Sequence, residues 1–140
     1  MNARVDFLLR LAALAQFAVA ILNLFLVRIM NWKPDLDRSP LLIREVFHVH
    51  CIFISITLSI FAALTWRFAG EIAHAASPLA IWLAAAIGFF WAARSIMQWT
   101  YYSASHWYGN IGRTFIHWLL FLGYAGFAVV YFTAAFWRNT

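Results

Sequence analysis

A chain of 140 residues with 65% hydrophobic and only 11% charged side chains differs from a soluble domain, in which these classes make up roughly 45–50% and 25%. Such a chain cannot cover its own surface in water, so the sequence predicts an integral membrane protein whose first partner is the lipid bilayer. The formal net charge of +5 indicates no nucleic-acid binding, because the basic residues are scattered singly. The single cysteine, Cys51, excludes an intramolecular disulfide.

Four apolar segments are long enough to cross a bilayer as helices, which takes about 20 residues each. They cover residues 7–30, 44–66, 78–102 and 114–137. The first contains Ala18-Val19-Ala20, which resembles a signal-peptide cleavage site, but it is longer than a signal core, so we expect a retained span. Trp99 and Tyr101 lie near a predicted span end, where interfacial aromatic residues gather. We expect an all-α fold, a four-helix transmembrane bundle forming a single domain over residues 1–140.

An even number of spans puts both termini on one side of the membrane, together with the second connection. Basic residues divide almost evenly between the two sides, so the orientation stays open.

Small or polar residues at helical spacing predict which helix faces turn inward, because helices in lipid associate through such contacts. The predicted inner faces are Gln16, Ala20, Asn23 and Val27 in the first span; Arg44, His48, Cys51, Ser55, Ser59 and Ala62 in the second; Ala84, Gly88 and Ser95 beside Arg94, Gln98 and Tyr101 in the third; and His117, Tyr124, Ala128, Tyr131 and Ala135 in the fourth.

The polar residues of the spans gather toward one end of the predicted bundle, where the second and fourth spans begin and the third ends. They are Arg44, Glu45, His48, His50, Arg94, Gln98, His106, Arg113 and His117. Arg94 lies deepest, and an unpaired charge inside the bilayer costs about 2.5 kcal/mol or more. We therefore expect Arg94 to snorkel to the headgroups, to pair with Glu45, or to bind an anionic group that is not protein. A position inside the bundle near Gln98 is the expectation we test.

Histidines from different spans suggest a redox site. His48 and His50 are about 200° apart on a regular helix, so one metal centre cannot take both, and the inner-face pattern favours His48. With His117 across the bundle, His48 would form the bis-imidazole pair that haem b requires. The alternative that the histidines form hydrogen bonds only with backbone groups or neighbouring side chains stays open. The sequence does not identify metal ligands or catalytic residues.

The runs Val49-His50-Cys51-Ile52-Phe53 and Phe90-Trp91-Ala92-Ala93-Arg94, with Gln98 and Tyr101-Tyr102, resemble a family of small, uncharacterised bacterial four-span membrane proteins. The resemblance covers the second and third spans and implies that His50, Arg94 and Gln98 are recurrent polar positions. It implies an acidic residue after the paired tyrosines, where this chain has Ser103. It also implies a multi-pass protein of the bacterial inner membrane, and brings no activity with it.

Three functions fit these observations. The composition favours an accessory subunit of a larger membrane complex, and the expected partners are other membrane protein subunits or further copies of this chain in a homo-oligomer. The first alternative is a redox subunit that binds haem b or a quinone through His48 or His50, Arg94, Gln98 and His117. The second alternative is an enzyme or carrier for a lipid or another apolar molecule, anchored by Arg94.

Overall fold

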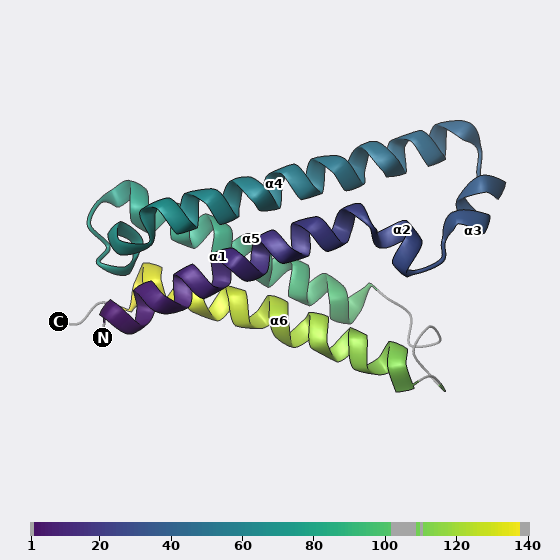
Figure 1. Cartoon of the computed structure of the whole chain (residues 1–140). Helices are drawn as coiled ribbons and strands as arrows, with labels where there is room; N and C mark the ends of the chain where they lie inside the picture. Colours follow the sequence, from purple (N-terminus) through teal and green to yellow (C-terminus); the bar gives the residue numbers. More distant parts are fainter. Residues whose placement is uncertain (1, 102–108, 110, 138–140) are drawn as a thin grey trace. The chain divides into compact units, whose positions relative to one another are not determined.

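A computed structural model describes residues 2–101, 109 and 111–137, and only the backbone of Arg113. Every regular element in these residues is a helix, so the prediction of an all-α fold is confirmed (Figure 1). The helices are α1 (Asn2–Leu24), α2 (Leu26–Ile29), α3 (Lys33–Arg38), α4 (Leu41–Ala73), α5 (Pro78–Thr100) and α6 (Ile111–Phe136). Four of them, α1, α4, α5 and α6, are long and apolar enough to span a membrane, as predicted.

The first two spans begin earlier than the hydropathy pattern predicts, and the first also ends earlier. Helix α1 runs from Asn2 to Leu24 and stops where the chain turns at Phe25. The short helix α2 follows, and a turn at Asn31, which has a φ of 54°, ends it. The amides of Asn31 and Trp32 donate to the carbonyl groups of Arg28 and Val27. This is a Schellman motif, in which asparagine is one of the few residues that tolerate the left-handed conformation.

Helix α4 is longer than predicted at both ends. It begins directly after Pro40 and runs to Ala73, with a kink at Phe68, where φ is −111° and ψ is 17°. A second Schellman motif ends it at Ala75, whose φ is 47°. The amides of Ala75 and Ala76 donate to the carbonyl groups of Ile72 and Glu71. Helix α5 then starts with Ser77 as its N-cap, since the Ser77 side chain accepts a hydrogen bond from the Ala80 amide at 3.2 Å.

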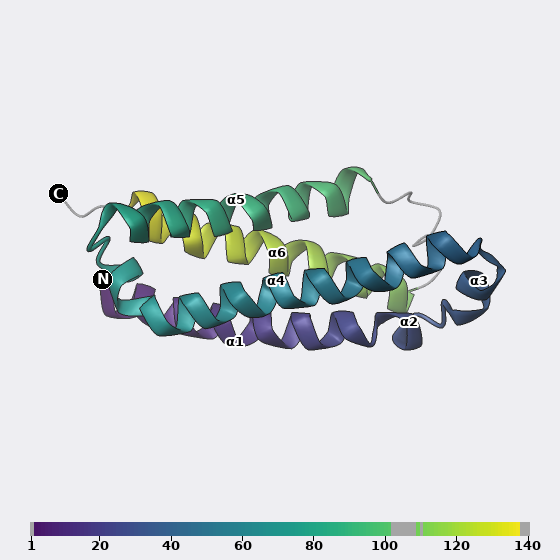
Figure 2. The same ribbon diagram turned by 90° about the horizontal axis from the view of Figure 1, so that it is seen from above.

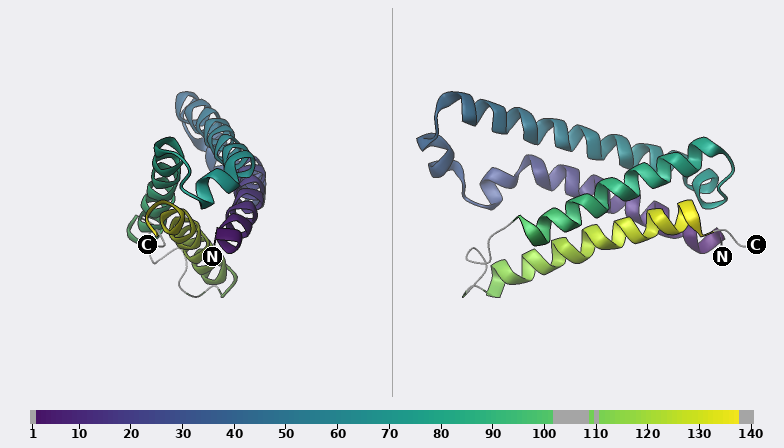
Figure 3. Two further views of the ribbon diagram at one scale, coloured as in Figure 1. Left: turned by 90° about the vertical axis from the view of Figure 1, so that its left-hand side faces the viewer. Right: turned by 180° about the vertical axis from the view of Figure 1, so that it is seen from behind.

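The chain divides into two compact units, which we describe separately. The N-terminal unit is Arg10–Arg67, and the C-terminal unit is Met1–Leu9 with Phe68–Thr140. In the N-terminal unit α1 and α4 form an antiparallel pair joined through α2 and α3 (Figure 3). Asn23 Nδ2 donates to Cys51 O at 2.8 Å and to Ser55 Oγ at 2.9 Å, and the Arg10 guanidinium lies 5.5 Å from the centroid of the Trp66 ring. These contacts tie the two helices together at both ends of the pair.

In the C-terminal unit α5 and α6 lie side by side and antiparallel (Figure 2). The backbones approach closely at Gly88, where an added β-carbon would lie 2.9 Å from Phe132 Cδ1 and 3.2 Å from Tyr131 Cβ. A larger residue here would force the Phe132 ring to shift, so glycine allows closer packing, as is common where membrane helices pack.

The first and last described residues, Asn2 and Trp137, lie near each other in the C-terminal unit. Asn2, Trp137 and the connection between α4 and α5, including His74 and Ser77, line one pocket of about 480 Å³. That both termini share one side of the membrane with the second connection stays a prediction.

The predicted inner faces are largely confirmed. Gln16, Ser55, Gly88, Tyr124 and Tyr131 are buried, and Asn23 and Ser59 are half-buried. The third span needs a correction, because Gln98 lies on one face with Gly88 and Ser95 rather than on a separate polar stripe. Tyr101 is wrong as an inner-face residue: it is 78% exposed, since α5 ends at Thr100.

Candidate functional site

A polar relay of Arg94, Gln98 and His117 joins α5 to α6 inside the C-terminal unit. Arg94 Nη1 donates to Gln98 Oε1 at 3.1 Å, and Gln98 Nε2 lies 3.1 Å from His117 Nδ1. Arg94 and Gln98 are one helical turn apart, a spacing that places two side chains on the same side of a helix. Gln98 is 2% exposed, His117 is buried and Arg94 is half-buried. Three of the five predicted site residues therefore meet in one place, with Arg94 next to Gln98 as expected.

The relay determines the direction of each hydrogen bond. A guanidinium group only donates, so Gln98 turns its oxygen toward Arg94 and its NH₂ group toward His117. His117 Nδ1 must then accept, and the imidazole proton is assigned to Nε2 from this hydrogen-bond pattern. One amide thus links a cation on α5 to a defined histidine tautomer on α6.

Aromatic rings hold the same cation from another direction. The Arg94 Cζ atom lies 4.9 Å from the centroid of the Tyr124 ring. Trp91, which is 1% exposed, stacks on Tyr124 with a centroid distance of 5.2 Å and an interplanar angle of 25°. A cation over an aromatic face gains about 0.5–2 kcal/mol, and a charged side chain at the centre of a membrane helix costs about 2.5–3.5 kcal/mol. The ring contact and the hydrogen bond to Gln98 together offset much of that cost.

Trp91 is a buried residue that the inner-face pattern does not include, because that pattern was defined by small and polar residues. The signal was available, since Gly88, Trp91, Ser95 and Gln98 follow one another at intervals of three and four residues. That spacing puts the indole on the buried face of α5. In the structure the indole is buried and stacks on Tyr124.

The relay does not fit the haem hypothesis at His117. An axial ligand must offer a ring lone pair to iron. The Nδ1 lone pair of His117 faces the Gln98 amide, and Nε2 carries the proton. Ligation through Nε2 would move the proton to Nδ1, where it would face the NH₂ group of Gln98. Among the described residues, no group of three or more His, Cys, Asp or Glu side chains is placed to hold a metal ion.

His48 and His50 are both exposed, so the prediction that His48 turns inward is wrong. His48 Nδ1 instead lies 2.7 Å from the carbonyl oxygen of Arg44, one turn earlier in the same helix. The physical reason is that α1 ends at Leu24, so within this unit its polar contacts with α4 begin only at Cys51. Spacing identifies a face of α4 but not how far along it a neighbour extends.

The two histidines and Glu45 belong to the N-terminal unit, whereas Arg94, Gln98 and His117 belong to the C-terminal unit. A pairing of His48 or His50 with His117, and of Arg94 with Glu45, therefore stays a prediction. The predicted contributions of His106, Tyr102 and Ser103 lie outside the described residues, as does the side chain of Arg113.

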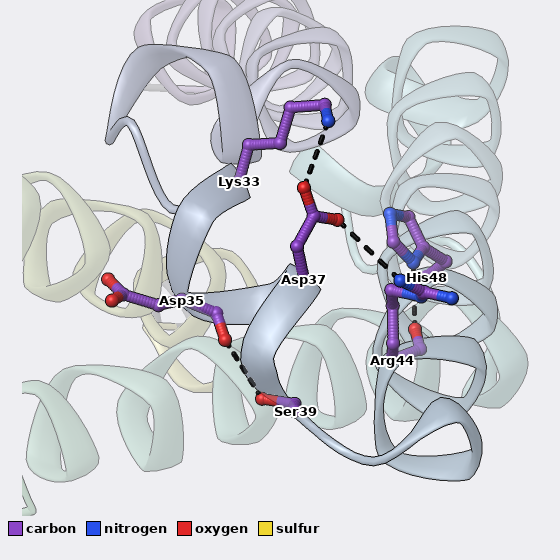
Figure 4. Close-up of polar contacts among 6 residues, drawn as sticks. All are labelled: Lys33, Asp35, Asp37, Ser39, Arg44 and His48. Atoms are coloured by element: carbon purple, nitrogen blue, oxygen red, sulfur yellow. Dashed lines mark hydrogen bonds and ion pairs between the residues drawn. The ribbon is translucent and has the colours of Figure 1, made fainter.

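A second polar cluster connects α3 to the start of α4 (Figure 4). Asp37 accepts a hydrogen bond from Lys33 Nζ at 3.0 Å and lies 3.6 Å from Arg44 Nη1. The hydrogen bond from Lys33 lowers the pKa of the Asp37 carboxyl, desolvation opposes this, and the nearby positive charges of Lys33 and Arg44 act with the hydrogen bond. Ser39 Oγ donates to the carbonyl oxygen of Asp35 at 3.1 Å. These contacts are exposed and salt-screened, so they fix the turn rather than form a binding site.

Comparison with family models, curated proteins and solved structures finds no match to this chain. The class of the protein therefore follows from its fold: four long apolar helices make it a small multi-pass membrane protein.

Proposed function

We propose that the chain is an accessory subunit of a larger complex in the bacterial inner membrane, and that it assembles there with other membrane proteins or with further copies of itself. The observation that supports this is the closure of the relay by the chain's own groups. Arg94 binds Gln98 and Tyr124, and Gln98 binds His117, so the deepest cation of the C-terminal unit serves to join α5 to α6. A polar network of this kind specifies one helix pair and leaves the outer apolar faces for lipid and for neighbouring subunits.

The redox alternative has less support. His117 is turned away from metal ligation by Gln98, and His48 uses Nδ1 to bond its own helix. The resemblance to bacterial four-span proteins adds no redox chemistry. An enzyme or carrier for an apolar molecule is the better second candidate, because an apolar groove of about 710 Å³ runs between α5 and α6.

The test is reciprocal dependence in the native membrane. The full chain, carrying a C-terminal tag, is extracted in a mild detergent, and proteins that co-elute in a fixed ratio are identified. Deleting the gene for a true partner should lower the abundance of this chain, and deleting this chain should lower that of the partner, because unassembled membrane subunits are degraded.

A visible spectrum of the same preparation separates the alternatives. The subunit proposal predicts no haem absorption that follows this chain through purification. A haem spectrum that disappears in a His117→Leu variant, while the variant still folds, would overturn the proposal in favour of the redox alternative.

A further inference from the structure

The surface of the α5–α6 pair carries an apolar groove that the relay does not use. It has a volume of about 710 Å³, and its lining falls into two kinds of residue. Small residues form one kind, namely Ala92, Ser95, Ala125 and Ala128, and larger side chains stand around them: Ile96, Trp99, Thr100, Trp118, Phe121, Val129 and Phe132. We propose that this groove binds one acyl chain of a membrane lipid, entering from the end where α5 finishes and α6 begins.

The two hydroxyl groups of the groove lining are hydrogen-bonded to backbone carbonyl groups. Ser95 Oγ donates to the carbonyl oxygen of Phe121 at 3.3 Å, and Thr100 Oγ1 donates to that of Ile96 at 2.9 Å. The groove therefore presents hydrocarbon and aromatic surface to its occupant. A polar ligand would lose its hydration there without recovering hydrogen bonds, whereas an alkyl chain has no hydrogen bonds to lose.

The groove is continuous with the lipid-facing surface of the helices. Ile96, Trp99, Trp118 and Val129 line it and are also exposed, and both helices are of membrane-spanning length. Hydrocarbon chains therefore already surround its walls. Because a chain in the bilayer gains no hydrophobic energy by entering, van der Waals contact with shaped walls is what would hold it.

The groove is shorter than the hydrocarbon core of a bilayer along both helices. With a rise of about 1.5 Å per residue, it runs about 12 Å along α5, from Ala92 to Thr100, and about 21 Å along α6, from Trp118 to Phe132. Half of the hydrocarbon core measures about 15 Å. A docked transmembrane helix would need a contact surface along the whole core, but the groove lining extends only to Ala92 on α5 and Phe132 on α6.

The mouth of the groove is built as a membrane interface. Trp99 and Trp118 meet there with ring centroids 5.5 Å apart. Tryptophan favours the headgroup level, where its ring contacts the chains and its N–H reaches polar groups. A lipid whose headgroup rests at these two indoles would lay its chain over the alanine and serine floor.

The experiment uses the full chain in phosphatidylcholine nanodiscs with a trace of phosphatidylcholine that carries a diazirine midway along one acyl chain. After photolysis, labelled positions are mapped by mass spectrometry. The proposal predicts that the groove residues Ile96 and Val129 carry more label than Phe89 on α5 and Phe115 on α6, which lie outside the groove and are similarly exposed. This comparison within the wild-type protein does not depend on any variant.

The matched variants are Ala92→Trp, which fills the floor, and Ala86→Trp, which adds the same ring at an exposed position of the same helix. Labelling of the groove should fall about fivefold in Ala92→Trp, a loss equivalent to about 1 kcal/mol of contact, and stay unchanged in Ala86→Trp. Helix content and elution volume report folding. Uniform labelling of all lipid-facing positions, or less label at Ile96 and Val129 than at Phe89 and Phe115, would overturn the proposal.

Discussion

Replacing Gln98 with leucine removes both hydrogen bonds of the relay and keeps a side chain of similar size. A hydrogen bond to a charged group contributes about 1.5–3 kcal/mol in soluble proteins, and hydrogen bonds between membrane helices average about 0.6 kcal/mol. Arg94 is half-buried and has the Tyr124 ring as a second support, so its share belongs at the low end. We expect Gln98→Leu to lower the free energy of unfolding by roughly 2 kcal/mol.

The companion variant is Gln98→Glu, whose carboxylate still accepts from Arg94 but no longer donates to His117. It should lose about 0.6 kcal/mol or less, because the proton of His117 can move to Nδ1 and restore the second bond. Reversible unfolding in mixed micelles, titrated with dodecyl sulfate and followed by circular dichroism, measures both. Thr100→Val, which removes a hydrogen bond within α5 only, is the control. A Gln98→Leu variant as stable as this control, or a Gln98→Glu variant as unstable as Gln98→Leu, would refute the reasoning.

The remaining predictions concern three other contacts. Arg94→Lys should lower the free energy of unfolding by about 1 kcal/mol in the same titration, because a point charge cannot hold both the amide and the ring; an unchanged curve would mean that the cation snorkels. Gly88→Ala should be less stable than Gly123→Ala by about 1–3 kcal/mol. The new methyl group would lie 2.9 Å from a phenyl ring at residue 88, whereas it would have no atom within 4 Å at residue 123. Equal stabilities of the two variants would contradict the close packing at Gly88. The pKa of Asp37 is lowered in the folded protein, so its contacts stabilise the turn fully at pH values above the ordinary pKa of 3.8. This stabilisation is lost as the pH falls through the lowered pKa of the folded state. Amide exchange over residues 33–44 should accordingly accelerate at low pH relative to an Asp37→Asn variant, and identical pH profiles for the two proteins would count against this.

The spans were predictable because membrane-length apolar runs admit few other structures. Their ends were not. Asn31 is a plausible left-handed residue, but nothing about Ala75 indicates that it adopts a φ of 47° and ends α4. Hydropathy also continues past Leu24 into α2, so the apolar run outlasts the helix. The position of each turn depends on local hydrogen bonds. Hydropathy averaged over many residues carries no information about these bonds.

The candidate site was half predictable for a related reason. Arg94 and Gln98 lie on one helix, so their spacing alone predicts that they are neighbours. The contact with His117 was predictable because polar groups of membrane helices form hydrogen bonds with each other. His48 satisfied the same spacing rule and is exposed, since periodicity does not reveal the length of the neighbouring helix. Trp91 was missed because its size concealed a buried position.

The central claim, that the chain works as a subunit, is tested most directly by its native mass in the membrane from which it comes. Native mass spectrometry of the tagged, full-length protein, released from nanodiscs formed directly from native membranes, reports every chain bound to it. The proposal predicts a discrete assembly heavier than one chain, with partner chains or further copies in a fixed ratio. A population consisting of single chains that carry only lipid would contradict it.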